Sequence, residues 1–188
     1  FMGMNPGPFG MSQNGVPFGD TTAVKDFLGV TGSHVKPDPE HPKRQIAGLG
    51  CKRGEVSGQR FWTLISNQCG ELGPQAFFAR NFVYNYCPLA FMTESGSNVT
   101  PDKLGKEERQ KLVEICDEAL AKLITLLGCQ RVVCLGQYAA ARAEKVTSGT
   151  NVKVVCLLHP SPASPQANKG WEEIAQKQLR DAGISLLE

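Results

Sequence analysis

The chain has 188 residues, 41% of them hydrophobic, which suits one domain with a substantial core. Its formal net charge of +2 is too small to indicate a nucleic-acid-binding protein, so a DNA-binding face would need a local cluster of Lys and Arg. No apolar stretch approaches the roughly 18–20 residues of a membrane span, and no secretory signal is recognisable. These features predict a soluble intracellular protein with no membrane partner.

Seven cysteines are spread along the chain without a C-x-x-C pair, and most lie in apolar stretches such as Val132-Val133-Cys134-Leu135. This distribution is typical of buried, reduced thiols in a cytosolic or nuclear protein. It lacks the paired thiolates of a zinc site and any quartet suited to an iron–sulfur cluster. We therefore expect neither a metal nor another cofactor.

The first residues predict the end of a strand, because Phe1-Met2-Gly3-Met4 is mainly apolar and leads into a loop rich in Gly and Pro. We expect residues 1–188 to form a single domain that lacks its N-terminal segment. The loop from Asn5 to Gly19 is too long for a simple connection. Asp20 and Thr21 then predict the cap of a helix that runs to Leu28 and ends at Gly29.

The next stretch alternates irregular and regular patterns. Residues 35–44 are rich in Pro and charge and predict irregular structure, whereas a helix is expected from Ser57 with Phe61, Trp62 and Ile65 on its apolar face. Residues 81–86 have the composition of a strand, which Pro88 ends because proline cannot continue a ladder.

The second half of the chain predicts two strands and three helices. The first helix covers residues 106–127, ends at Gly128 and has its apolar face at positions 112, 115, 119, 123 and 126. Strands follow at 131–135 and 152–158, with helices at 137–145 and 171–182. Alternating strands and helices predict an α/β fold of three layers, α/β/α, around a central and mostly parallel sheet.

Three polar residues, Asn5, Asn85 and His159, fall at the ends of three predicted strands. Ligands of such sheets bind at the carboxyl edge, so these side chains are expected to converge there. Each residue alone has an ordinary explanation, since Asn5 could form a turn, Asn85 could satisfy its own backbone, and His159 before a proline could end a strand.

Longer motifs around these residues resemble a known family. They are Gly3-Met4-Asn5-Pro6-Gly7-Pro8-Phe9-Gly10-Met11 with Gly15-Val16-Pro17-Phe18-Gly19, then Tyr84-Asn85-Tyr86-Cys87-Pro88-Leu89, and finally His159-Pro160-Ser161-Pro162 with Pro165-Gln166-Ala167-Asn168-Lys169-Gly170-Trp171. In this order they resemble the single-strand-selective monofunctional uracil-DNA glycosylases. The resemblance extends over essentially the whole chain and implies the uracil-DNA glycosylase fold.

The resemblance implies that the protein removes uracil, and 5-substituted uracils such as 5-hydroxymethyluracil, from single- and double-stranded DNA in base excision repair. The target nucleotide must first leave the base stack. Asn5 would orient the attacking water, Asn85 would read the base, and His159 would stabilise the departing uracil anion. No lysine or terminal amine occupies the first motif, around Asn5, which favours a monofunctional enzyme that leaves an abasic site.

Further site residues are implied by the same motifs. Phe18 would stack on the extruded base, Gly7 and Gly10 would let the backbone approach it, and Met11 would line the edge that excludes thymine. The expected substrate-binding residues are Met4, Gly7, Phe9, Gly10, Met11, Phe18 and Asn85. The expected DNA-binding residues are Pro160, Ser161, Pro162, Ala163, Ser164, Pro165, Gln166 and Lys169. Lys43 and Arg44 are further candidates for the DNA backbone, whereas Lys52 and Arg53 are better explained as ordinary solvated surface.

The chain departs from the family pattern in the second motif. Vertebrate members carry an arginine and an asparagine after Ser-Pro, whereas this chain has Ala163 and Ser164. Short side chains cannot fill the space that a flipped nucleotide leaves, so we expect weaker activity on paired than on single-stranded uracil.

Two other readings remain open at this stage, a thymine/uracil mismatch glycosylase and a nonenzymatic module that binds damaged bases. A nucleotide-binding enzyme is disfavoured because the first loop lacks the spacing of a phosphate-binding motif. The expected partners are DNA containing uracil or oxidised uracil and a downstream abasic-site endonuclease. We also expect a monomer that acts in the nucleus.

Overall fold

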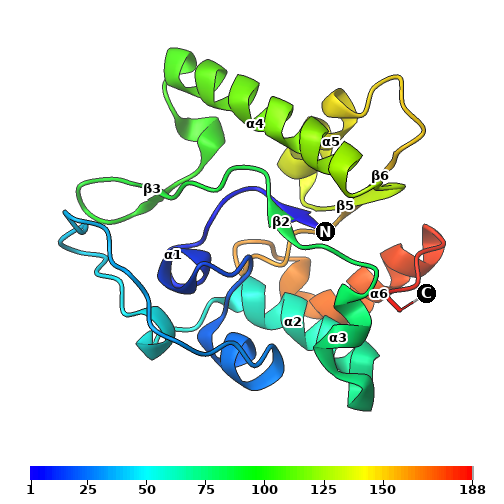
Figure 1. Cartoon of the computed structure of the whole chain (residues 1–188), viewed down its shortest axis with the longest axis horizontal. Coiled ribbons are helices and arrows are strands. Elements are labelled where there is room, and N and C mark those ends of the chain that lie inside the picture. Colours follow the sequence, from blue (N-terminus) through cyan, green and yellow to red (C-terminus); the bar gives the residue numbers. More distant parts are fainter. Residues whose placement is uncertain (188) are drawn as a thin grey trace.

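A four-stranded parallel sheet forms the centre of the computed structural model, which describes residues 1–187 (Figure 1). The strand order is β2-β1-β5-β6. The bounds are β1 Met2–Gly3, β2 Tyr84–Asn85, β5 Arg131–Leu135 and β6 Lys153–Leu157. β5 and β6 pair along their whole length, whereas β1 pairs with β5 only at Met2 and Cys134.

Helices cover both faces of this sheet. One layer holds α2 (Val56–Cys69), α3 (Gly73–Phe78) and α6 (Trp171–Asp181), and the other holds α4 (Lys106–Leu126) and α5 (Gln137–Val146) (Figure 1). Alternate residues of β5 point to opposite faces, as the pleat requires. Val133 and Leu135 join the core cluster beneath α2 and α6, while Val132 and Cys134 join the cluster beneath α4 and α5. The predicted three-layer α/β/α architecture is confirmed.

Most predicted elements are present with small shifts of their ends. The helix after Asp20 begins at Thr21 and takes π geometry over Ala23–Phe27, with Asp20 Oδ1 accepting the Ala23 N–H at 3.3 Å. The strand predicted at 81–86 contains only the paired residues of β2, because its neighbour β1 offers two residues for pairing.

Several short elements were not predicted. They are α1 (Met11–Asn14), the six-residue helix α3, an antiparallel hairpin of β3 (Phe91–Met92) and β4 (Asn98–Val99), and 3₁₀ turns at Gly48–Gly50, Gly70–Leu72, Pro101–Lys103 and Ala167–Lys169. Each is too short to show a hydrophobic period. α1 lies within the stretch expected to be a continuous loop.

The apolar face predicted for α4 was wrong in part. Ile115 and Leu126 are 67% and 82% exposed, whereas Cys116 and Leu120 are buried against the sheet. Apolar residues lie on more than one side of this helix, and packing on β5 selects the side that includes Cys116. Within the described residues, no helix is long and apolar enough to span a membrane.

Candidate active site

The carboxyl edge of the sheet carries the three polar residues that the sequence singled out. Asn5 lies two residues after β1, Asn85 is the last residue of β2, and His159 lies two residues after β6. Asn5 and Asn85 therefore follow neighbouring strands. Since β5 lies between β1 and β6, two strand spacings, roughly 10 Å, separate the chain at Asn5 from the chain at His159.

Gly136 follows the intervening strand β5 and leaves room for the imidazole of His159. A Cβ atom at Gly136 would lie 3.2 Å from both Cβ and Cδ2 of His159, and the φ of Gly136 is +96°, which also favours glycine. The end of β5 thus contributes no side chain between the two outer groups.

His159 is held as a neutral ring in one tautomer. Burial lowers the pKa of His159 below its ordinary value of 6.5. Its Nδ1 accepts a hydrogen bond from the backbone N–H of Ser161 at 3.0 Å, so Nδ1 carries no proton. In a neutral imidazole the proton is then on Nε2, which can donate a hydrogen bond to a ligand.

Asn85 is 4% exposed, and its amide lies beside the first loop. Nδ2 donates a hydrogen bond to Met11 Sδ at 3.1 Å. A Cβ atom at Gly3 would collide with Asn85 Oδ1 and would lie close to the ring of Phe18. Gly3 therefore lets the amide and the ring share the space above β1, and a base that pairs with Nδ2 has to displace the sulfur of Met11.

Phe18 lies in this group of side chains but is largely buried, with 9% exposure. Its backbone has a φ of +54°, a left-handed conformation uncommon for a residue with a Cβ. Its carbonyl accepts hydrogen bonds from Trp62 Nε1 (3.0 Å) and from the backbone of Asp20 (2.8 Å). The ring packs on Phe61 at a centroid distance of 4.8 Å. These contacts fix the orientation of the Phe18 ring.

The remaining residues of the first motif have different surroundings. Met4 and Asn5 are partly buried, and Asn5 Nδ2 donates only a long hydrogen bond, 3.4 Å, to the carbonyl of Pro6. Two guanidinium groups lie near the ring of Phe9, with Arg53 Cζ 4.0 Å and Arg44 Cζ 5.3 Å from its centroid. A phenylalanine in contact with two cations offers a charged surface for a phosphate backbone at least as readily as a stacking surface for the base.

The loop after His159 is fixed to α2 by Arg60. Its Nη1 donates to the carbonyl of Pro160 at 2.9 Å, and its Nη2 donates to Asn168 Oδ1 at 2.8 Å. Asn168 Nδ2 in turn donates to the carbonyl of Pro162 at 2.9 Å. The guanidinium group thus joins both ends of the expected DNA-binding segment.

The expected DNA-binding residues divide by exposure. Pro160 is buried, so its contribution is to the base of the loop rather than to a surface. Ser161 and Ser164 are partly buried and stabilise turns, since their hydroxyl groups accept the N–H groups of Ala163 (3.1 Å) and Ala167 (3.4 Å). The exposed residues are Pro162, Ala163, Pro165, Gln166 and Lys169.

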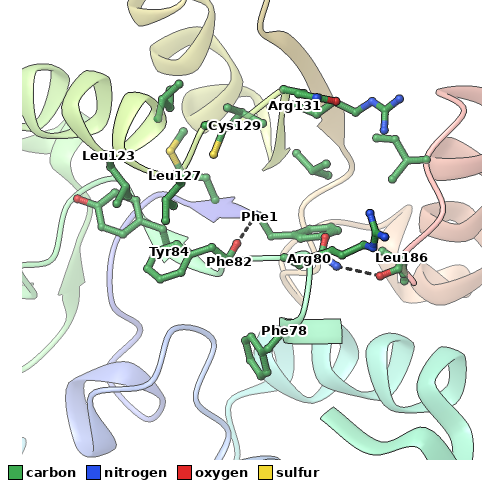
Figure 2. A pocket seen from close by; sticks show the side chains of 18 of the residues that line it. Phe1, Phe78, Arg80, Phe82, Tyr84, Leu123, Leu127, Cys129, Arg131 and Leu186 are labelled. Carbon is green, nitrogen blue, oxygen red and sulfur yellow. Dashed lines mark hydrogen bonds between the residues drawn. The ribbon is translucent and has the colours of Figure 1, made fainter. Parts of the chain in front are cut away.

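A cavity of about 610 Å³ lies at the opposite, amino edge of the sheet (Figure 2). Phe1, Phe82, Tyr84 and Leu127 line it, together with residues at the start of β5 and residues 184–186. Asn5, Asn85 and His159 line neither this cavity nor a second one of about 400 Å³ between α4 and α5. In this structure Met11 occupies part of the space beside the Asn85 amide.

Sequence reasoning gave no role to three residues that hold the site together. Arg60 joins the second loop to α2, and Glu55 contacts the first loop at Gly7 and Gly10. Asn14 stabilises the turn before Phe18, because its Nδ2 donates to the Gly19 carbonyl at 2.6 Å and its Oδ1 accepts the Val16 N–H at 3.1 Å. Asn14-Gly15 is a recognisable turn signal, whereas the contacts of Arg60 and Glu55 depend on tertiary structure.

Comparisons with known proteins point to one family. Residues 1–181 match the family model described as the uracil DNA glycosylase superfamily. Over 186 residues, 98% of the chain, the sequence is 50% identical to the single-strand selective monofunctional uracil-DNA glycosylase of Rattus norvegicus and 48% identical to the corresponding protein of Bos taurus. The chain covers 66% of the rat protein and 68% of the bovine one, so it spans about two thirds of the length of these relatives.

A solved structure of wild-type SMUG2 from Pedobacter heparinus has a similar fold. The TM-score is 0.68 at 22% sequence identity, with 97% of this chain and 73% of that chain covered. At this identity the likeness supports the arrangement of the sheet and helices only.

Proposed function

The chain belongs to the single-strand selective monofunctional branch of the uracil-DNA glycosylase superfamily, and from this premise we propose that it hydrolyses the N-glycosidic bond of uracil in DNA. The observation that carries the proposal is the neutral His159, whose Nε2–H donor lies at the same sheet edge as the two amides. This edge is where ligands of parallel α/β sheets bind.

His159 acts on the leaving group. As the bond between C1′ and uracil N1 breaks, its electron pair moves onto the base, and negative charge develops on the ring and its carbonyl oxygens. The N–H group at Nε2 of the neutral ring stabilises this charge by donating a hydrogen bond, so the ring does not have to be protonated first. Removal of one such donor typically slows the chemical step about 100- to 1,000-fold.

Asn5 holds the water that adds to C1′. Its amide is uncharged, so its contribution is to position the water oxygen rather than to act as a strong base. One water proton passes to the solvent as the new C1′–O bond forms, and the uracil anion takes up a proton from the solvent after it departs. The products are free base and an abasic site.

Asn85 selects the base. Its Nδ2–H donor matches a uracil carbonyl and its Oδ1 acceptor matches the N3–H, whereas cytosine presents the reverse pattern. Phe18 stacks on the base, and Met11, displaced from the Asn85 amide, lines its edge. We extend the proposal to 5-substituted uracils such as 5-hydroxymethyluracil and to both single- and double-stranded DNA.

The biological setting is also a proposal. A monomeric enzyme of this kind would act in the nucleus and pass its abasic product to an abasic-site endonuclease. DNA contact would involve the exposed residues of the second loop, especially Gln166 and Lys169. In a thymine/uracil mismatch glycosylase the same residues would also accept thymine. In a module that only binds damaged bases they would hold the base without hydrolysing the bond.

The decisive experiment is to incubate a uracil-containing oligonucleotide with the protein in the presence of a metal chelator and then to treat it with alkali. We expect strand scission only after alkali, together with release of free uracil. Scission before alkali would contradict a monofunctional reaction, and no abasic sites at all would favour the binding module. A matched oligonucleotide with a thymine mismatch tests the other alternative, which requires base release from that substrate.

A further inference from the structure

The first loop lies against the side chain of Glu55, the residue that precedes α2. A Cβ atom at Gly7 would collide with Glu55 Oε2 and would lie 3.0 Å from Cδ. A Cβ atom at Gly10 would lie 2.9 Å from Glu55 Cγ and 3.3 Å from its Cβ. Both glycines of the motif therefore face the side chain of Glu55. A methyl group at Gly7 or at Gly10 would displace this side chain.

The backbone of Glu55 is itself held in place by Asp20. Its backbone N–H donates to Asp20 Oδ2 at 3.0 Å, and Asp20 is 2% exposed and also accepts Gln59 Nε2 at 3.1 Å. Burial raises the pKa of the Glu55 carboxyl, although a hydrogen bond from the backbone of Ser57 acts in the opposite sense. Its place before the first turn of a 14-residue helix is one that favours a negative charge.

We propose that Glu55 is a positioning residue, whose carboxyl group fixes the loop that carries Asn5, and that Gly7 and Gly10 are glycines because they must make room for it. This inference rests on the proposed glycosylase function. It differs from the explanation that the resemblance suggested, in which the two glycines allow the backbone to approach the base.

The physical reason is the short stretch of chain between Gly7, which contacts Glu55, and Asn5, which holds the attacking water. Asn5 precedes Gly7 by two residues, so their Cα atoms are at most about 7 Å apart. A shift of the loop at Gly7 therefore moves the amide that holds the water. Misplacement of a reacting group by about 1 Å can cost about 100-fold in rate.

A double-mutant cycle tests the contact directly. The four proteins are the wild type, Gly7→Ala, Glu55→Ala and the variant with both changes, with Gly50→Ala as the control because a Cβ atom there meets open space. We expect each single change to lower the rate constant of uracil release, measured in single-turnover assays at saturating protein, about 10- to 100-fold. We expect the double variant to be within about threefold of the worse single one, because both changes break the same contact. The protein concentration that gives half of the maximal rate should change little, since no DNA contact is removed.

Two results would overturn the proposal. One is a double variant whose loss equals the product of the single losses, and the other is a Gly7→Ala variant no slower than Gly50→Ala. An inactive wild type would instead overturn the proposed function and the positioning role that rests on it. The unfolding midpoints of the same four proteins would then form a second cycle that decides whether the contact holds the loop.

Discussion

The imidazole of His159 shows how one backbone hydrogen bond can determine the chemistry of a side chain. Ser161 N–H occupies Nδ1, and burial keeps the ring neutral. The sequence placed His159 at the end of a strand but left its tautomer and its protonation open, because both properties depend on neighbours that only the folded chain supplies. The same lowered pKa has a consequence for stability.

We predict that stability falls as the pH drops below about 6.5, in part because of His159. The unfolded chain takes up a proton near pH 6.5, whereas the folded chain takes it up only at the lowered pKa of His159. As the pH falls between these two values, protonation stabilises the unfolded state and the free energy of unfolding decreases. His159→Gln should remove this part of the loss. Urea unfolding at pH 7.5 and pH 5.5 measures it, with exposed His34→Gln as control. An equal loss in wild type and His159→Gln would refute the prediction.

The site residues were predictable to different degrees. Asn5, Asn85 and His159 could be placed at one edge because each follows a strand, and parallel strands end on the same side of a sheet. Met11 against the Asn85 amide, and Glu55 beneath Gly7, could not be predicted from spacing. These contacts join segments 45 to 75 residues apart, roughly speaking, and depend on how α1 and α2 pack.

At the level of secondary structure, long patterns were reliable and short ones were not. β5 and β6 were predicted from continuous apolar runs, which pack against helices on both faces of the sheet, and α5 has one clear buried face. α4 was placed correctly along the chain, but its buried side includes Cys116 and Leu120 rather than Ile115. The helix carries more apolar residues than one face can hold, so only contact with the sheet decides which are buried.

The loop after His159 combines a rigid base with a short tip. Arg60 and Asn168 fix its two ends, while Ala163 at the tip is exposed and has only a methyl side chain. A change at position 163 can therefore alter what the loop inserts into DNA without moving His159. This separation makes the tip a suitable place to test duplex opening.

We predict that Ala163→Arg raises the rate on duplex uracil about 10-fold and changes the rate on single-stranded uracil less than threefold. A longer side chain can fill the space left by the flipped nucleotide, which offsets a few kcal/mol of lost stacking. Single-turnover rates on matched single- and double-stranded oligonucleotides measure the ratio. Ala163→Ser serves as the control because a single hydroxyl group is too short to fill this space. An unchanged ratio in Ala163→Arg would argue against a wedge role for this tip.

On the scale of the whole molecule, charge is nearly balanced, so DNA attraction has to come from where the cations lie. The net charge is +2, yet Arg44 and Arg53 flank Phe9 on the first loop and Lys169 is exposed on the second. On α4, Lys122 is instead paired with Glu118 at 2.6 Å. The distribution favours DNA contact at the carboxyl edge with few phosphates neutralised.

We therefore predict a shallow salt dependence of DNA binding and a measurable contribution from Lys169. Each phosphate contact to a single strand adds about −0.7 to the slope of log K against log salt concentration. Lys169→Ala should make this slope less negative by about 0.7 for an oligonucleotide with a non-cleavable uracil nucleotide, measured by fluorescence anisotropy. Lys122→Ala should leave it unchanged, because that ammonium lies on α4 and is paired with Glu118. Equal slopes for Lys169→Ala and the wild type would place the DNA backbone elsewhere on the molecule.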